Sequence, residues 1–513
     1  MSKRLRNLIL TAVALLVVVG LLVLLLLLPE NADPSSSGDP ASTADTSVVL
    51  IDKSKDADGN AVQAPIRQIE IASPTAQFTV ENDEEAGLRV TAYADFTADT
   101  TKLSSLVTYL KTITASRLVK SDVADLAGYG FTAEQATAVT VTYHDGTVYA
   151  FELGIESPGE AGRYFRQKDE NDVYLVSTYL GTAVDEDPLS YIERSLIVAP
   201  SVNSDDTKGS AVLRDMELTG TLRPQAVAFR RVTDSDAAAL QHTGYVITKP
   251  ALRSMNDVVL QEISSIVSLT AASVVCPHPT AEQLAEYGLA EPFSVAQFNM
   301  AVSSTRTVAG EDDAETEEEY YYNVQPHTVR LGKKDADGNY YALVDELDMV
   351  VTLMPSAVPW AEQTYDTLVD PLLFMQMITD IQTITVTAEG QTHVFELTHR
   401  PDEDDRDLSL IVTCDGTTYS TPYMRKLYQV LMVIKRTGPA TAPVPDTEPT
   451  LTVELTPIAG SEGKHILAKL YKLSGSQYLC VQENGDVYQV TARSVNAAIE
   501  QLNNYLACKE VIL

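Results

Sequence analysis

The chain has 513 residues, with 37 basic and 71 acidic side chains and a formal net charge of −34 at pH 7. A surface this acidic excludes nucleic acid as a favoured partner, because phosphate binding needs clustered lysines and arginines. Hydrophobic residues make up 45% of the chain, an ordinary share for folded protein. The composition therefore predicts folded cores beneath an acidic surface.

Residues 8–28 form an apolar run without a charged residue, preceded by Lys3, Arg4 and Arg6. A helix of about 20 apolar residues spans a bilayer, and a basic flank favours a cytoplasmic N-terminus. The alternative is a signal peptide cleaved within the following Ser-rich stretch, but secretory apolar regions are usually about 7–15 residues long and end at a small-residue cleavage site, which is absent here. We expect a cytoplasmic tip at 1–7 and an uncleaved signal anchor at 8–28, which place everything after residue 28 outside the plasma membrane.

The stretch after the apolar run is rich in Ser, Asp, Pro, Ala and Thr and has no apolar period. This composition is typical of a flexible linker. We expect residues 29–65 to be a flexible, acidic and Ser-rich tether between the membrane and the folded part.

Beyond the tether the sequence repeats with a period of about 150 residues, which indicates an array of related units. The predicted units are 66–200, 213–379 and 380–513, the second with an acidic insert at about 305–320. Each unit opens with two predicted strands, at 66–71 and 77–81, at 216–219 and 226–230, and at 381–386 and 393–397.

A predicted helix follows each strand pair, because apolar residues recur at spacings of three and four. These residues are Leu103, Leu106, Leu110 and Ile113; Leu252, Met255, Val259, Ile263 and Ile266; and Met424, Leu427, Leu431 and Ile434. A last helix carries Val495, Ile499, Leu502 and Leu506. An Asp145-Gly146 pair between alternating strands predicts a hairpin with a tight primed turn. The fold class is therefore α+β: an N-terminal transmembrane helix, then three related repeats of mostly antiparallel strands with one or two helices each, as an elongated array.

Short motifs recur in the same order in the units. The first unit has Tyr129-Gly130, Leu153-Gly154, the strand 171–176 and Asp187-Pro188-Leu189; the second has Tyr287-Gly288, Leu331-Gly332, the strand 339–344 and Asp370-Pro371-Leu372. The third unit lacks the Tyr-Gly element but keeps a strand at 485–490 that matches 171–176.

With its anchor and these motifs, the chain resembles the bacterial family known as domain of unknown function 4340 over roughly residues 66–500. The resemblance implies a membrane-anchored extracytoplasmic protein, often encoded beside ABC-transporter genes of the gliding-motility auxiliary type. It carries over no catalytic residues.

No motif of known chemistry is present. The seven histidines lack the spacing of a zinc protease, and the chain has no phosphate-binding loop and no nucleophile elbow. His393 and His399 lie on one strand face and are expected to be exposed strand positions rather than metal ligands. We therefore predict no catalytic residue, no cofactor and no metal site.

The segment Asp335-Ala336-Asp337-Gly338-Asn339 looks like part of a calcium loop, as do residues 56–60. In an EF-hand, however, Lys333 would occupy position 1 and Val344 would replace the bidentate Glu of position 12. The expected structure is a turn between strands.

Four features leave a choice between a structural and a functional interpretation. The acidic insert is either a solvated loop or a site for cations or a basic partner, and the acidic run 402–405 reads as a solvated loop. Trp360 is either a packing residue or a partner anchor. The four cysteines have no spacing of a disulfide framework, and Cys414 and Cys480 lie in strand-like runs that predict buried thiols.

The function best supported by the sequence is that of a non-catalytic, membrane-anchored auxiliary or binding subunit of an ABC-type transport system. Its expected partners are the lipid bilayer, through 8–28, and either membrane subunits of the transporter or other envelope proteins. A structural or surface-interaction protein of the cell envelope is the alternative, and an envelope hydrolase with an unrecognised site is a more remote one.

Overall fold

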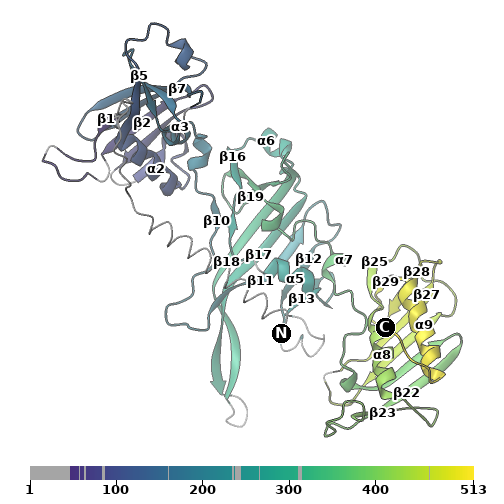
Figure 1. The fold of residues 1–513 in the computed structure, drawn as a ribbon. Coiled ribbons are helices and arrows are strands. Elements are labelled where there is room, and N and C mark those ends of the chain that lie inside the picture. Colours follow the sequence, from purple (N-terminus) through teal and green to yellow (C-terminus); the bar gives the residue numbers. More distant parts are fainter. Residues whose placement is uncertain are drawn as a thin grey trace, which may run out of the picture.

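The computed structural model describes residues 47–513, apart from breaks at 57, 63–64, 84–86, 160, 234–235, 237–243, 265, 310–314 and 462. These residues form three bodies in a row, each built on one nine-stranded antiparallel sheet (Figure 1). Each sheet contributes to its own core of buried apolar side chains together with the helices of its body. The described chain is therefore mostly β with packed helices, which confirms the predicted α+β class.

The N-terminal body contains β1 to β9 and two helices. Its elements are β1 (Val48–Asp52), β2 (Ile66–Ala72), β3 (Gln77–Asp83), β4 (Gly87–Val90), α2 (Thr100–Lys111), β5 (Thr112–Lys120), β6 (Thr137–Tyr143), β7 (Val148–Glu156), β8 (Arg163–Gln167), β9 (Val173–Val176) and α3 (Thr178–Val184). Helix α2 starts at an Asp99 cap, whose carboxylate accepts the Lys102 N–H at 3.0 Å. It buries Leu103, Leu106 and Leu110, as predicted, but it ends before Ile113, which lies in β5. A run of β-branched residues, 112–114, favours the strand at that point.

The middle body follows a short strand, β10 (Ser195–Ile197). Its elements are β11 (Ser210–Thr219), β12 (Val227–Arg231), β13 (Tyr245–Lys249), β14 (Arg253–Ser254), α5 (Asp257–Ser264), β15 (Leu269–Thr270), β16 (Ser273–Pro277), α6 (Ala281–Glu286), β17 (Ser294–Ala309), β18 (Glu315–Lys334), β19 (Tyr340–Val344), β20 (Met349–Leu353) and α7 (Tyr365–Leu368). Helix α5 is shorter than predicted, because Arg253 and Ser254 pair with β13 and Met255 forms a bridge to Val369.

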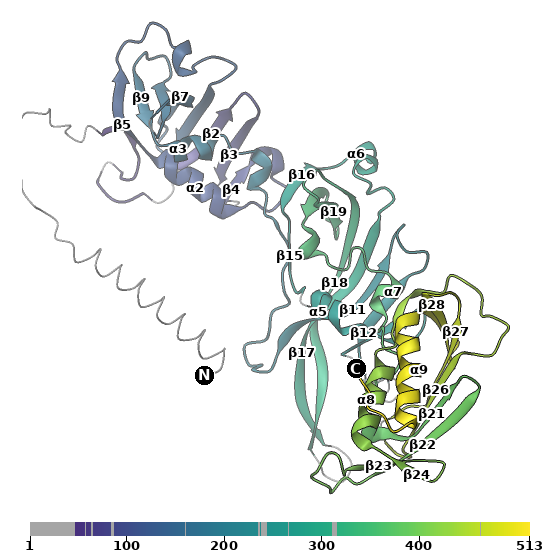
Figure 2. The same cartoon turned by 45° about the vertical axis from the view of Figure 1, so that its right-hand side comes forward.

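The C-terminal body has two long helices side by side on one face of its sheet (Figure 2). Its elements are β21 (Ile381–Ala388), β22 (Gln391–His399), β23 (Leu410–Cys414), β24 (Thr417–Tyr419), α8 (Thr421–Met432), β25 (Arg436–Pro439), β26 (Leu451–Pro457), β27 (Ile466–Lys472), β28 (Gln477–Gln482), β29 (Val487–Thr491) and α9 (Ala492–Leu506). The apolar spacing predicted both helices, and Met424, Leu427, Leu431, Val495 and Leu502 are buried on the faces turned to the sheet.

The three sheets share one strand order. In each sheet a first strand (β2, β11, β21) pairs on one side with a hairpin run and on the other with a four-stranded meander (β6–β9, β17–β20, β26–β29). The last meander strand pairs with a strand that lies after the helix in the chain: β5 directly after α2, β25 directly after α8, and β16, which is separated from α5 by the short strand β15. What differs is an additional edge strand: β1 at one edge of the first sheet, and β14 and β24 at the opposite edge of the other two.

This strand order corrects one predicted correspondence. The strand predicted at 339–344 was matched with 171–176, but β19 holds the third place in its meander, which in the first body belongs to β8. The place of β9 is taken by β20 in the middle body and by β29 in the C-terminal body. Short apolar strands after a turn resemble one another, so only the pairing separates them.

The predicted tether is too long at its C-terminal end. Residues 48–52 form β1 and pair with β5 at the edge of the first sheet, although 29–65 was expected to be flexible. The residues before 47, including the predicted tip at 1–7 and anchor at 8–28, lie outside the described residues. Among the residues that are described, no helix is both long and apolar enough to cross a membrane.

Two predicted unit boundaries also shift. Ile192 and Ile197, placed in the first unit, are buried in the core of the middle body. Leu373 and Phe374, placed in the second unit, are buried in the core of the C-terminal body. Connecting segments carry apolar residues that pack into the next core, and composition alone does not show which core receives them.

The acidic insert at 305–320 is not an irregular loop. Beyond Ser303 the strand β17 pairs only with β18 in the described part, from Ser304 opposite Tyr320 to Ala309 opposite Glu315. Figure 1 shows this pair as a two-stranded arm that extends beyond the middle sheet. Cross-strand pairing of Arg306 with Glu318, whose nearest atoms are 2.7 Å apart, explains how the acidic strand is tolerated.

Candidate functional site

The motif residues that carry the recurring pattern have structural roles. In the first body, a Cβ atom at Gly154 would overlap the carbonyl oxygen of Tyr129, and in the middle body a Cβ at Gly332 would overlap that of Tyr287. The Lys333 N–H donates to the Tyr287 carbonyl at 2.9 Å. Glycine is therefore needed for close backbone approach at both positions.

The aromatic rings of the same motif are placed alike. Tyr129 contacts Tyr164 of β8 with ring centroids 4.9 Å apart, and Tyr287 contacts Tyr341 of β19 at 4.6 Å. Since β8 and β19 hold the same place in their meanders, the Tyr-Gly element docks on the same strand in both bodies.

The two calcium-like segments are turns, as predicted. Asp335 Oδ1 accepts the N–H groups of Asp337 at 2.9 Å and of Asn339 at 2.8 Å. Asp56 Oδ1 accepts from Asp58 at 3.0 Å and Asn60 at 2.8 Å in the same way. These carboxylates hold their own turns together.

Several single residues that the sequence analysis considered also have structural roles. Trp360 is 1% exposed and lies in the middle core, so it is a packing residue. Cys414 and Cys480 are buried as predicted, and all four cysteines are free thiols.

The Asp145-Gly146 hairpin forms with Gly146 at φ 84, but Asp145 does not have the positive φ of a primed turn. Its loop has three residues, because Tyr143 N–H donates to the Thr147 carbonyl at 2.9 Å.

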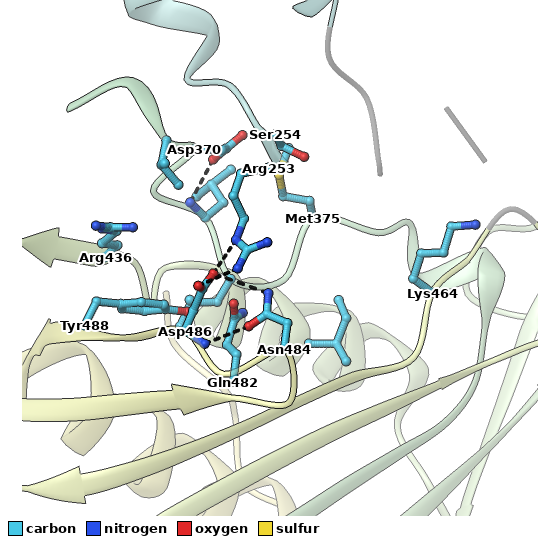
Figure 3. A pocket seen from close by; sticks show the side chains of 14 residues that line it. Arg253, Ser254, Asp370, Met375, Arg436, Lys464, Gln482, Asn484, Asp486 and Tyr488 are labelled. Atoms are coloured by element: carbon cyan, nitrogen blue, oxygen red, sulfur yellow. Dashed lines mark hydrogen bonds and ion pairs between the residues drawn. The ribbon is translucent and has the colours of Figure 1, made fainter. Parts of the chain in front are cut away.

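A polar cleft lies where the middle body meets the C-terminal body (Figure 3). Its volume is about 190 Å³, below the roughly 300–1,000 Å³ usual for pockets that bind small organic molecules. The lining residues are Arg253, Ser254, Val369, Asp370, Leu372, Leu373 and Met375 near the middle body, and Arg436, Lys464, Ile466, Gln482, Asn484, Asp486 and Tyr488 of the C-terminal body.

Two arginines of the cleft form ion pairs between the bodies. Arg253 on β14 donates to both carboxylate oxygens of Asp486, with Nε–Oδ2 2.5 Å and Nη2–Oδ1 2.6 Å. This hydrogen bonding raises the pKa of Arg253. Arg436 on β25 pairs with Asp366 of α7. The bidentate pair of Arg253 with Asp486 fixes geometry as well as charge.

Aromatic rings complete the surroundings of Arg436. Its guanidinium lies over Tyr365 of the middle body at 5.5 Å and over Tyr488 of the C-terminal body at 5.4 Å, measured to the ring centroids. Its side chain is 9% exposed, and burial lowers the pKa of the group. The backbone joins the same place, because the Arg436 N–H donates to the Pro371 carbonyl at 2.7 Å.

Asp370 is the carboxyl of the cleft whose titration is altered. Burial raises its pKa, with a further increase from the charge of Asp257, while the Leu372 N–H bound to its Oδ1 at 2.8 Å acts in the opposite direction. A raised carboxyl pKa in a cleft is a feature of general acids. In this cleft Asp370 also caps a turn, next to the two arginines that pair across the bodies.

The other joint, between the N-terminal and middle bodies, is centred on His278. This residue follows β16 and places Nε2 2.9 Å from Asp95 Oδ2 of the N-terminal body and Nδ1 2.8 Å from Asp348 Oδ2 of the middle body. The ring of Phe96 contacts it at 5.0 Å between centroids. The hydrogen bond to Asp348 and the charges of both carboxylates raise the pKa of His278.

Sequence reasoning missed both joints, because their partners are remote in the chain. Arg253 and Asp486 are separated by 233 positions. No spacing rule connects them, and the only sequence signal was a basic residue in a strongly acidic chain.

Comparison with known proteins identifies a family for part of the chain. Residues 89–292 match the family described as domain of unknown function DUF4340, which confirms the predicted resemblance. The matched segment runs from β4 to the loop before β17 and contains the Tyr-Gly elements of both bodies. No curated protein and no solved structure matches the chain.

Proposed function

Because residues 89–292 match the DUF4340 family, we propose that this protein is a non-catalytic, membrane-anchored extracytoplasmic subunit that serves an ABC-type transport system. In this proposal residues 8–28 hold the chain in the plasma membrane, and the three bodies present a binding or scaffolding surface outside it.

We further propose that the three bodies are copies of one α+β unit. The shared strand order supports this, as does the helix that precedes β5, β16 and β25 in each body. The Tyr-Gly contact with the glycine of β7 and of β18 supports it for the first two bodies. A repeated unit adds length and surface without a new active site, as in other repeat proteins.

The observation that carries the proposal is the chemistry of the cleft at the second joint. Its strongest donors, Arg253 and Arg436, are bound to Asp486 and Asp366, so their charges join two bodies. A reaction centre would instead direct such groups at a substrate. Within the described residues, the cleft is also smaller than sites for organic substrates usually are.

Site-specific photo-crosslinking in intact membranes tests the proposal. A crosslinking residue at exposed Glu318 on the β17–β18 arm would report partners of the middle body. A second position, Tyr179, 69% exposed on the N-terminal body, would report partners of that body. Capture of a permease or ATPase subunit of a transporter from either position is the expected result.

Two other outcomes would replace the proposal. Crosslinks to envelope proteins alone, with normal transport in a deletion strain, would favour a structural envelope protein. Hydrolytic activity of the purified full-length protein that is lost in D370N would favour an enzyme, because Asp370 is the carboxyl with a raised pKa in the cleft.

A further inference from the structure

Three potential metal-binding side chains meet on the C-terminal body, away from both joints. They are His393 near the start of β22, Cys414 at the end of β23, and Asp415 in the turn that follows. One ligand atom from each lies within 4.8 Å of the other two. Cys414 Sγ and Asp415 Oδ2 are 3.8 Å apart.

Strand register explains the contact between His393 and Cys414. Glu396 pairs with Thr413 across β22 and β23. Continuing this antiparallel register by one residue sets Phe395 opposite Cys414. Because side chains two positions apart on a strand share a face, His393, two residues before Phe395, is a diagonal neighbour of Cys414 on that face.

The turn between β23 and β24 directs Asp415. Asp415 has φ 51 and Gly416 has φ 74, the two positive values of a type I′ hairpin turn. Asp-Gly is among the sequences this turn prefers. The turn thus holds the carboxylate directly beside the thiol that precedes it.

The His393 imidazole differs from those of four other histidines in the described part of the chain. In the part that the structure describes, no hydrogen bond or ion pair engages its ring nitrogens, and its ring stacks on Phe395 with centroids 6.5 Å apart. Four other histidines bind a carboxylate or a carbonyl: His278, His327, His399 and His465. The ring nitrogens of His393 are therefore available to a ligand.

Below the cluster, the thiol is enclosed. Cys414 is 3% exposed, while Asp415 is exposed. Phe395, Tyr419 and Tyr505 pack against one another, with centroids 5.3 to 6.3 Å apart, in the same core as Cys414. A divalent cation bound here stabilises the thiolate and neutralises the adjacent Asp415 carboxylate.

We propose that His393, Cys414 and Asp415 form a binding site for a divalent transition metal, with Zn²⁺ as the best match. Imidazole nitrogen, thiolate sulfur and carboxylate oxygen are all zinc ligands, with bond lengths of about 2.0–2.3 Å. Ligand atoms in such a tetrahedral site are about 3.3–3.8 Å apart, so small side-chain rotations close the present cluster around the ion. Binding releases the thiol proton to solvent, and the fourth position is open to water.

Metal titration of the full-length protein in detergent, with any affinity tag removed, tests the site. The metal-free protein is titrated with Zn²⁺ against a chromophoric chelator, and separately with Co²⁺ to record the thiolate-to-metal absorption band. We expect one Zn²⁺ per chain, a Co²⁺ band that C414S abolishes, and tighter zinc binding at higher pH.

Matched variants assign the ligands. H393Q, C414S and D415N are each expected to weaken zinc binding at least about 100-fold, the upper end of the loss for second-shell partners. D415N keeps a turn-compatible Asn-Gly pair, so its thermal midpoint without metal should equal that of the wild type and exclude misfolding as the cause. H465Q, which removes the histidine held by Glu454 and Glu483, and C508S, which removes an exposed thiol of the same body, should bind zinc as the wild type does.

Two results would overturn the proposal. One is a wild-type affinity for Zn²⁺ no greater than that of the H393Q/D415N double variant. The other is loss of binding in H465Q or C508S with binding retained in H393Q.

Discussion

The two joints of this chain hold neighbouring bodies with different chemistry. Between the N-terminal and middle bodies, His278 lies between two carboxylates, Asp95 and Asp348, and is 53% exposed. Between the middle and C-terminal bodies, Arg253 and Arg436 form less exposed ion pairs with Asp486 and Asp366. Histidine changes charge near neutral pH whereas arginine does not. From this comparison we expect the first joint to be adjustable by pH and the second to be permanent over the same pH range.

Removal of Arg436 should break the second joint most severely. R436A leaves the Asp366 carboxylate partly buried without its partner and removes the stacking on Tyr365 and Tyr488, so a loss of about 3 kcal/mol is expected. Trp360, the single tryptophan, reports the middle body by fluorescence. The urea midpoint of its transition should fall.

The control for R436A is R493A, which removes an exposed arginine from α9 of the same body. Surface substitutions of this kind usually change stability by less than about 0.5 kcal/mol. Equal midpoints for R436A and the wild type would contradict a permanent joint based on Arg436.

A smaller loss of stability is expected for R253K, in which residue 253 keeps its positive charge but loses the planar guanidinium group. R253K cannot form two parallel hydrogen bonds with Asp486, and a loss of about 1 kcal/mol follows. Spin labels at Cys508 and at V258C, both exposed and on different bodies, measure the distance across the joint. With Cys276 replaced by serine, this distance distribution should broaden in R253K.

R306K provides the comparison for this experiment, because Arg306 pairs with Glu318 on the exposed arm and not at a joint. Its distance distribution should match that of the wild type. If R253K and R306K give the same distance distribution, the guanidinium group of Arg253 does not hold the two bodies together.

The smallest effect, and the one that separates the joints, is pH dependence at His278. Its folded pKa is raised above 6.5 by the hydrogen bond to Asp348 and the neighbouring carboxylates. The contact is therefore fully formed below pH 6.5 and is lost as pH rises through the raised value. Labels at Y179C and V258C, with Cys276 and Cys508 replaced, should show a broader distance distribution at higher pH.

The second joint should not respond over the same range, since arginine remains charged. H278Q removes the titrating group and should remove the response of the first joint while leaving the second unchanged. A pH response that survives in H278Q would show that another group controls the first joint.

Much of the local structure followed from the sequence. Apolar spacing predicted α2, α8 and α9, and alternation predicted the opening strands of all three bodies, because these patterns depend on which face of an element is buried. The failures were of another kind. Ile113 continued a helical period but lies in β5, and the acidic insert formed an arm because its two strands pair with each other.

The joints and the metal-binding cluster were beyond sequence reasoning. His393 was expected to be an exposed strand position but is half-buried, whereas Cys414 is a buried thiol as expected, and neither expectation joined the two residues. Their meeting depends on the register of β22 with β23, and the joints depend on how whole bodies are placed.

The sequence by itself determined the family pattern, the α+β class and the recurring Tyr-Gly and Leu-Gly motifs, since these reside in contiguous residues or short repeated segments. Only the tertiary structure decided which charges meet. Arg253 reaches Asp486, His278 reaches Asp95, and His393 reaches Cys414 through strand pairing and packing of segments far apart in the chain. Ion pairs and metal ligands require atoms a few ångströms apart, and that proximity is a property of the folded chain.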